Sequence, residues 1–220
     1  MSDSTSCKRV VSVGSMGLEG FLRLPPDPLG LVIFAHGAGS SHLSLRNNFV
    51  AEEFEKRAIT ILLFDLLTEE ETQNHANVFD IKLLSMRMVD AIFWSRANSD
   101  IPALPVGLFG SSTGAAAALV AAARTPSDVI TVVSRGGRPD LADDALPQVH
   151  APVLLIAGRK DYPVVRLNEA AAERLTCTWK LEVVDGATHL FKESGALEQE
   201  VVSLAGAWFE THSTKAETRL

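Results

Sequence analysis

Residues 106–114 read Val-Gly-Leu-Phe-Gly-Ser-Ser-Thr-Gly. The first four, Val106–Phe109, form a short apolar run typical of a buried strand, and the alanine-rich segment Thr113–Arg124 is typical of a helix. Between them, Ser112 has a glycine two residues away on each side, which matches the pattern Gly-x-Ser-x-Gly. A sharp turn from strand to helix strains such a serine and exposes its hydroxyl above the carboxyl edge of the sheet. We therefore predict that Ser112 is a nucleophile.

Ser111 is the local rival of Ser112. If Ser111 were the nucleophile, Phe109 and Thr113 would occupy the positions that need glycine. The helix amides that begin at Thr113 also favour the negative charge that develops on an attacked carbonyl oxygen. The spacing therefore favours Ser112.

Short apolar runs alternate with helical segments on both sides of this turn. We expect strands at Val10–Val13, Leu18–Leu24, Leu31–Ala35, Thr60–Asp65, Val106–Phe109, Ile130–Ser134, Val153–Ala157 and Lys180–Val184. We expect helices at Asn47–Arg57, Val78–Ala97, Thr113–Arg124, Val164–Leu175 and Ala196–Thr211. The middle strands are continuously apolar, as in sheets covered on both faces. A hairpin at residues 14–17 followed by alternating strands and helices predicts an α/β domain with a mostly parallel sheet.

The length and composition suit one globular domain. The chain has 220 residues, of which 46% are hydrophobic and 21% charged, so we expect a single domain over residues 1–220 with tails near 1–8 and 213–220. The acidic loop at residues 69–71 is expected to be a solvated turn. The net charge of −7 argues against a nucleic-acid partner.

The chain shows no sign of a membrane span or a signal peptide. No apolar run approaches the roughly 18 residues that a span requires, and the first residues lack a basic region followed by an apolar core. Cys7 and Cys177 are too few and too far apart for a disulfide framework or a metal site. These features predict a cytoplasmic protein that needs no metal.

A histidine and an acid follow the serine where later strands end. A serine hydroxyl needs an adjacent imidazole to accept its proton, and a carboxylate must hold that imidazole in the right tautomer. His189 lies just after the strand Lys180–Val184, and Asp161 lies just after Val153–Ala157. The order serine, acid, histidine is the one that this kind of strand–turn–helix fold uses. We predict Ser112, Asp161 and His189 as catalytic residues.

The other candidates for base and acid fit less well. The remaining histidines lie in polar or loop segments: His42, His75 and His212 are expected at the surface, His150 in a loop, and His36 in a loop that it shapes by hydrogen bonding. Further acids also stand near strand ends, namely Asp140, Asp143, Asp144 and Asp185. Asp140 is the main alternative to Asp161, because some related folds carry the acid after the preceding strand.

A glycine-containing loop can supply the oxyanion hole. The strand Leu31–Ala35 ends in His36-Gly37-Ala38-Gly39, and such a turn can aim a backbone N–H at the nucleophile. Ala38 is the first candidate for this donor and Gly37 the second. The backbone N–H of Thr113 is the expected second donor.

Together these motifs resemble the dienelactone-hydrolase-like branch of the α/β-hydrolases, from about Leu18 to Phe209. The segments that carry the likeness are His36-Gly37-Ala38-Gly39, Leu63-Phe64-Asp65-Leu66-Leu67-Thr68, Gly110-Ser111-Ser112-Thr113-Gly114, Ser134-Arg135-Gly136-Gly137-Arg138-Pro139, Asp161 and Gly186-Ala187-Thr188-His189. The resemblance implies the α/β-hydrolase fold, a three-layer αβα sandwich, and a cofactor-free cytoplasmic hydrolase of esters. Dienelactone hydrolases proper carry a cysteine where this chain has Ser112, which favours general carboxylester chemistry.

The segment after the sixth expected strand bears on the substrate. Residues 136–151 are too few for a large cap, so a small and open site is expected. Arg135 and Arg138 lie at the same sheet edge as Ser112, where an arginine can hold a substrate carboxylate. Either arginine could instead pair with nearby acids and fix the loop, which we favour from sequence alone.

The sequence thus predicts a serine hydrolase of small or water-soluble carboxylic esters that acts through an acyl-enzyme. Two alternatives stay open: a homologue that binds a small molecule without turnover, and an acyltransferase with the same residues. The expected partner is a small-molecule ester. Monomer and homodimer are both compatible with the sequence.

Overall fold

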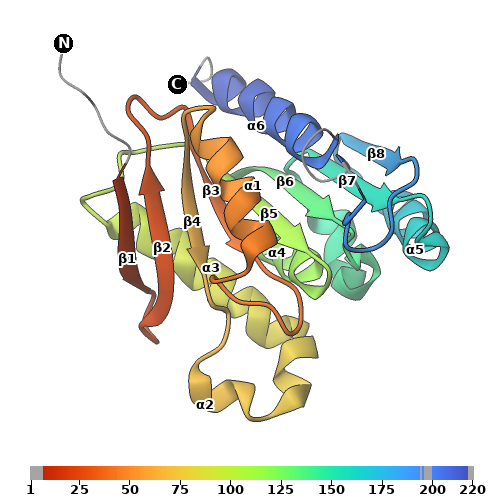
Figure 1. Ribbon diagram of the computed structural model, residues 1–220, viewed down its shortest axis with the longest axis horizontal. Helices are drawn as coiled ribbons and strands as arrows, with labels where there is room; N and C mark the ends of the chain where they lie inside the picture. The colour runs from red at the N-terminus through yellow and green to blue at the C-terminus, as the bar shows by residue number, and fades with distance from the viewer. Residues whose placement is uncertain (1–6, 194, 196–199, 218–220) are drawn as a thin grey trace.

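An eight-stranded sheet forms the centre of the computed structural model, which describes residues 7–193, 195 and 200–217 (Figure 1). The strands are β1 (Cys7–Val13), β2 (Leu18–Leu24), β3 (Gly30–Ala35), β4 (Ile59–Phe64), β5 (Val106–Ser111), β6 (Val129–Arg135), β7 (Val153–Gly158) and β8 (Trp179–Val184). Their spatial order is β1-β2-β4-β3-β5-β6-β7-β8. Pairing is parallel from β4 to β8, while β2 pairs antiparallel with both β1 and β4. The predicted strands, hairpin and mostly parallel sheet are confirmed.

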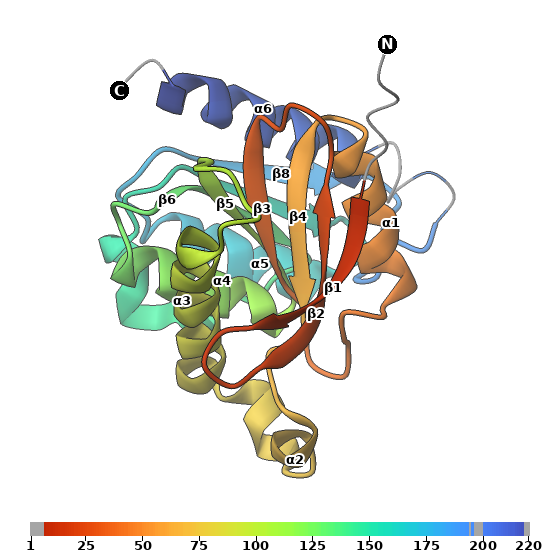
Figure 2. The same cartoon turned by 90° about the vertical axis from the view of Figure 1, so that its left-hand side faces the viewer.

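Helices connect the parallel strands and cover both faces of the sheet. The helices are α1 (Leu45–Glu55), α2 (Glu69–Thr72), α3 (Ile81–Ala97), α4 (Thr113–Arg124), α5 (Tyr162–Ala172) and α6 (Val202–Glu217), with 3₁₀ segments η1 (His75–Phe79) and η2 (Pro139–Gln148). In Figures 1 and 2, α1 and α6 lie on one face and α3, α4 and α5 on the other. The chain therefore forms the predicted three-layer αβα sandwich.

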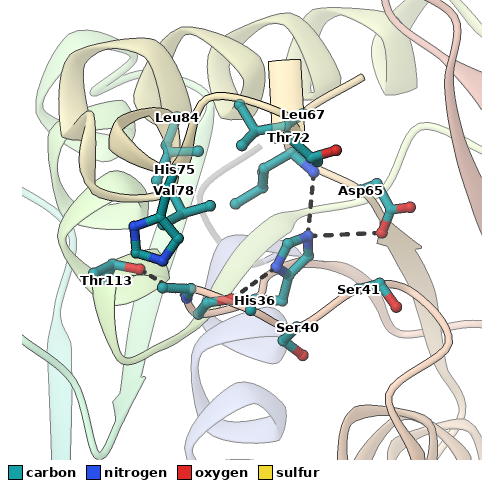
Figure 3. Close-up of a pocket in the computed structure, with 14 residues that line it drawn as sticks. His36, Ser40, Ser41, Asp65, Leu67, Thr72, His75, Val78, Leu84 and Thr113 are labelled. Carbon is teal, nitrogen blue, oxygen red and sulfur yellow. Dashed lines mark hydrogen bonds and ion pairs between the residues drawn. The ribbon is translucent and has the colours of Figure 1, made fainter. Parts of the chain in front are cut away.

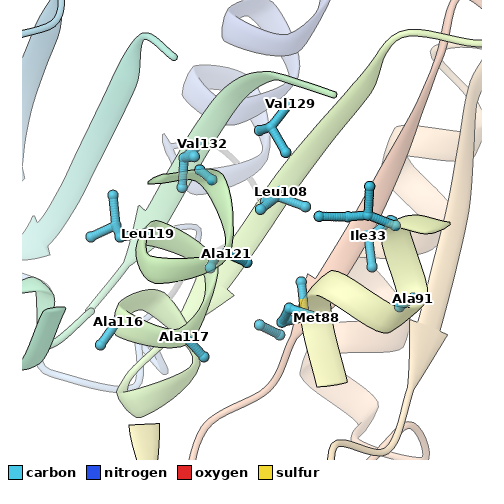
Figure 4. Close-up of a cluster of buried hydrophobic side chains, with 14 of the residues drawn as sticks. Ile33, Met88, Ala91, Leu108, Ala116, Ala117, Leu119, Ala121, Val129 and Val132 are labelled. Atoms are coloured by element: carbon cyan, nitrogen blue, oxygen red, sulfur yellow. The ribbon is translucent and has the colours of Figure 1, made fainter. Parts of the chain in front are cut away.

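Each face of the sheet has its own hydrophobic core. Under α1 and α6, Phe34, Phe54, Phe109 and Phe209 form a cluster of buried rings. On the other face, the buried alanines of α4 allow that helix to pack closely on the sheet beside α3 (Figure 4). These cores fix the positions of the strand ends, where the loops that carry the predicted site residues begin.

Two short segments differ from the sequence-based expectations. Residues 69–71 were expected to form a turn, but they start α2, because Thr68 and Glu71 form a reciprocal capping box. At the other end, α6 continues through Glu217, past Ser213, where a frayed tail was expected. Ser213 is buried and lies against the start of β3. Residues 196–199, at the start of the expected helix Ala196–Thr211, lie outside the described residues.

The carboxyl edge of the sheet is left without a large cover between β6 and β7. Only η2 joins these two strands, and all of its residues are described, so the expected absence of a large cap holds for this connection. None of the described helices is long and apolar enough to cross a membrane.

Candidate active site

Ser112 lies in a strained turn between β5 and α4. Its backbone has φ 52° and ψ −124°, a region that residues with side chains rarely adopt. A Cβ on Gly110 would collide with Cα of Ala115, and a Cβ on Gly114 would collide with the carbonyl oxygen of Ala35. Both flanking glycines are therefore required by close backbone approach, as the nucleophile-elbow pattern predicts.

His189 and Asp161 form a direct pair beyond β8 and β7. The Nδ1 atom of His189 lies 2.7 Å from Oδ2 of Asp161. The Asp161 side chain is 15% exposed and that of His189 is 40% exposed. A Cβ built on Gly136, just after β6, would lie 3.8 Å from Cε1 of His189, so the imidazole lies over the end of β6, the strand next to β5. The structure thus brings the predicted base and acid together at the edge where Ser112 stands.

The alternative acids have other partners. Asp140 accepts two hydrogen bonds from Arg138, at 2.9 and 2.8 Å. Asp143 pairs with Arg174, and Asp185 pairs with Arg159. Among the described residues, Asp161 is the carboxylate that contacts the His189 ring, which favours it over Asp140.

The loop after β3 packs directly against Ser112. A Cβ on Gly37 would lie 2.7 Å from Cβ of Ser112 and 3.5 Å from its Oγ. The Ala38 N–H donates to Oγ1 of Thr113 at 3.1 Å, so this amide faces the turn that holds the nucleophile. Because Thr113 is the first residue of α4, its own N–H has no partner within that helix. The Ala38 amide and the first amide of α4 thus both lie beside the turn that carries Ser112.

Two histidines and Asp65 anchor this loop. His36 Nε2 accepts from the Leu66 N–H at 3.2 Å, which agrees with the predicted loop-shaping role. His42 donates its backbone N–H to Oδ1 of Asp65 at 2.6 Å, and its Nδ1 lies 2.8 Å from Oδ2. His42 was expected at the surface, and this was wrong: it is 4% exposed, because the Asp65 carboxylate after β4 draws it inward. Burial lowers the pKa of His36.

A cavity of about 270 Å³ opens beside the Ala38–Thr113 contact (Figure 3). Its walls beyond the loop after β3 come from the segment that runs from the end of β4 into α3: Asp65, Leu66, Leu67, Thr72, His75, Val78 and Leu84. His75 and Thr113 both line this space (Figure 3). Of these lining residues none was predicted from sequence, because no local motif marks a wall that forms only when α2 and η1 fold over the loop.

The two arginines at and after the end of β6 have different surroundings. Arg138 forms the bidentate pair with Asp140 and so fixes the loop, which is the structural alternative considered from sequence. Arg135 is buried, and its one hydrogen bond to a described side chain is a long one, 3.5 Å from Nη2 to Oδ1 of Asn47. Over the described residues, no group of three or more His, Cys, Asp or Glu side chains is arranged to hold a metal ion.

A strained serine after a central strand, a histidine–aspartate pair beyond two later strands and a glycine loop after the third define a hydrolase-type α/β domain. Comparisons with known proteins agree. The family model described as "Alpha/beta hydrolase domain" matches residues 29–211. A dienelactone hydrolase from Anabaena variabilis is 48% identical, with a TM-score of 0.89 over 94% of this chain and 98% of that chain. The chain therefore belongs to the α/β-hydrolase domain family, in its dienelactone-hydrolase-like branch.

Two further proteins are similar to this chain, one in fold and one in sequence. The esterase domain of a Rhodothermus marinus protein has a TM-score of 0.71 at 19% identity, over 95% of this chain and 99% of that one, which shows the shared fold alone. A Mycobacterium tuberculosis protein provisionally named a phosphoribosyl transferase is 52% identical over 202 residues, or 92% of this chain. The chain spans 45% of the length of these curated relatives.

Proposed function

We propose that this domain is a serine hydrolase that cleaves small carboxylic esters through an acyl-enzyme on Ser112. One observation carries the proposal. The His189–Asp161 pair, joined at 2.7 Å, lies at the same sheet edge as a serine held at positive φ. A buried carboxylate fixes the imidazole tautomer that leaves Nε2 free to accept a proton. Backbone strain at a serine is a costly feature that is characteristic of functional sites.

The reaction follows from these positions. Ser112 Oγ attacks the ester carbonyl carbon while its proton passes to Nε2 of His189. The carbonyl oxygen becomes an oxyanion that the Ala38 and Thr113 amides stabilise. The tetrahedral intermediate collapses, the bond to the alcohol oxygen breaks, and the alcohol leaves with the proton from His189. Water then attacks the acyl-enzyme by the same route, which releases the acid and restores Ser112.

The cavity beside the oxyanion loop suits a small substituent of the ester. Leu67, Val78 and Leu84 make part of its wall apolar, and its volume of about 270 Å³ is at the lower end for small-molecule sites. The short η2 connection adds no cover above Ser112. These features support small or water-soluble esters over long-chain lipids.

The relatives support hydrolysis at a general level. The names dienelactone hydrolase and esterase belong to proteins of similar extent and fold. The transferase name of the mycobacterial relatives belongs to proteins of which the chain matches less than half, so that activity need not reside in the matched part. The proposal therefore rests on the geometry of this chain's own residues.

The test is intact-mass spectrometry after incubation with a fluorophosphonate probe. We expect one adduct on the wild type and none on Ser112→Ala. Ser111→Ala is the matched control, because Ser111 is a neighbouring serine that is 6% exposed, and it should still be labelled. An unlabelled wild type would leave only the ligand-binding alternative, and an adduct that persists in Ser112→Ala would place the nucleophile elsewhere.

A further inference from the structure

Arg135 is a buried arginine without a counter-ion among the described residues. It is the last residue of β6 and is 8% exposed. Among the residues described, its buried Nη1 atom has no hydrogen-bond partner, and its Nη2 atom makes one long contact, to Asn47. Removing an ionised group from water is expensive unless an opposite charge or several hydrogen bonds replace the solvent. Over the part of the chain that the structure describes, the guanidinium therefore has no negatively charged group to replace the lost solvent.

The groups around Arg135 also carry positive charge or partial positive charge. Asn47 lies in the first turn of α1, after the N-cap Ser44, and this turn contains no acidic residue. The N-terminal end of a helix carries a partial positive charge and favours anions. Arg46 lies in the same turn, close enough to repel the Arg135 guanidinium. Burial, followed by this repulsion, lowers the pKa of Arg135 to about 10. Three positive features thus converge where the described residues supply no carboxylate.

Arg135 stands at the end of the strand next to the one that leads into Ser112. Arg135 is the residue of β6 that pairs in register with Ser111 of β5. The next residue, Gly136, lies against the His189 backbone and ring. Arg135 also contacts α1 on one face of the sheet, whereas Val78 and Leu84 line the cavity on the α3 side. Arg135 and the cavity thus lie on different sides of the strand end that leads into Ser112.

We propose that Arg135, together with Arg46 and the first turn of α1, binds an oxyanion carried by the ester substrate, a carboxylate or a phosphate. The inference rests on the proposed function and adds the chemical class of its substrate. Arg138 does not serve this purpose, because Asp140 already neutralises it through two hydrogen bonds. A planar guanidinium with a free Nη edge can hold either oxyanion through paired hydrogen bonds.

The first test compares p-nitrophenyl hydrogen glutarate with p-nitrophenyl pentanoate, which are similar in length and differ in the terminal carboxylate. In Arg135→Met we expect kcat/KM for the acidic ester to fall roughly 10- to 100-fold, while the value for the neutral ester changes less than about 3-fold. Arg46→Gln should give a smaller loss for the acidic ester alone. Arg166→Gln, which removes an exposed arginine on α5, should change neither. Equal losses on both esters in Arg135→Met would overturn the inference.

The second test does not depend on turnover. Inorganic phosphate or glutarate should raise the thermal unfolding temperature of the wild type but not that of Arg135→Met. A rise with glutarate alone identifies a carboxylate, and a rise with phosphate alone identifies a phosphate group. Without ligand, Arg135→Met should be as stable as the wild type, because it removes an unpaired buried charge. No rise with either anion contradicts the proposal, and if Arg135→Met does not fold, Arg46→Gln decides both tests.

Fluorophosphonate labelling separates the two proposals. If the wild type is not labelled, the proposed hydrolase function fails, and the anion-dependent rise in unfolding temperature still tests the Arg135 site. If wild type and Arg135→Met are both labelled but show the same ratio of acidic to neutral ester activity, only the inference about Arg135 fails.

Discussion

Asp161 is the residue on which the orientation of the His189 ring depends. Its Oδ2 lies 2.7 Å from Nδ1, and an amide at this position would favour the wrong tautomer of the imidazole. We expect Asp161→Asn to lower kcat by about 10³- to 10⁴-fold on a small p-nitrophenyl ester. Steady-state kinetics with protein of confirmed native circular dichroism is the measurement.

Asp140 provides the matched control for this prediction. It also follows a strand, but its carboxylate accepts from Arg138 and not from His189. Asp140→Asn should therefore keep kcat within about 10-fold of the wild type, well short of the loss of a triad member. The reverse ranking of the two variants would show that Asp140 supplies the acid.

His36 makes the stability of the fold depend on pH. Burial lowers its pKa in the folded state, so below the unfolded pKa of about 6.5 the unfolded chain binds more protons. The stability that the neutral ring permits is therefore complete above about pH 6.5 and decreases as pH falls. We predict that the free energy of unfolding decreases from pH 7 to 5 more steeply for the wild type than for His36→Gln, by at most about 1.4 kcal/mol per pH unit.

Urea unfolding at pH 7, 6 and 5 measures this difference. Glutamine is a suitable replacement because its carbonyl oxygen can still accept from the Leu66 N–H, the bond that His36 Nε2 makes. Parallel pH dependences for the two proteins would show that His36 does not contribute to the loss of stability.

At the level of elements, the turn from β5 into α4 depends on close approach to the end of β3. A Cβ on Gly114 would collide with the Ala35 carbonyl oxygen, which is backbone and cannot move aside cheaply. We expect Gly114→Ala to lower the free energy of unfolding by about 2–4 kcal/mol. Chemical denaturation monitored by circular dichroism is the measurement.

Gly186→Ala is the control for backbone strain without collision. Gly186 has φ 74°, and a Cβ there would meet no atom within 4 Å. Its cost should be about 1 kcal/mol, the penalty for a side chain in the left-handed region. If both substitutions cost the same, crowding at the end of β3 is not what requires Gly114.

Local patterns were enough to predict most of the elements. The continuous apolar runs identified the parallel strands, and the glycine pair at residues 14–17 identified the β1–β2 hairpin. Among the expectations that were wrong, one failed because of a contact distant in sequence and another because of a local helix cap. His42 was expected at the surface because it lies in a polar stretch. It is buried because it contacts Asp65, which lies 23 positions further along the chain. The acidic residues 69–71 form the start of α2, because the local Thr68–Glu71 capping box stabilises a helical turn there.

At the scale of the whole molecule, the strand order explains why residues far apart in sequence could be expected at one edge of the sheet. Parallel strands place their carboxyl ends at one edge, so loops after β3, β5, β7 and β8 meet although they are far apart in sequence. The positions of Ser112, Asp161 and His189 therefore followed from strand assignments. The cavity wall between β4 and α3 and the unpaired Arg135 depend on how helices pack on each face, which strand assignments do not determine.

The central claim is that Ser112 carries the acyl group during turnover. The most direct measurement is to mix the enzyme with p-nitrophenyl acetate, quench with acid within the first turnover and map the acetylated peptide by mass spectrometry. We predict a burst of about one p-nitrophenol per chain and an acetyl group on Ser112. Turnover without a covalent acetyl group, or an acetyl group on a different residue, would contradict the account.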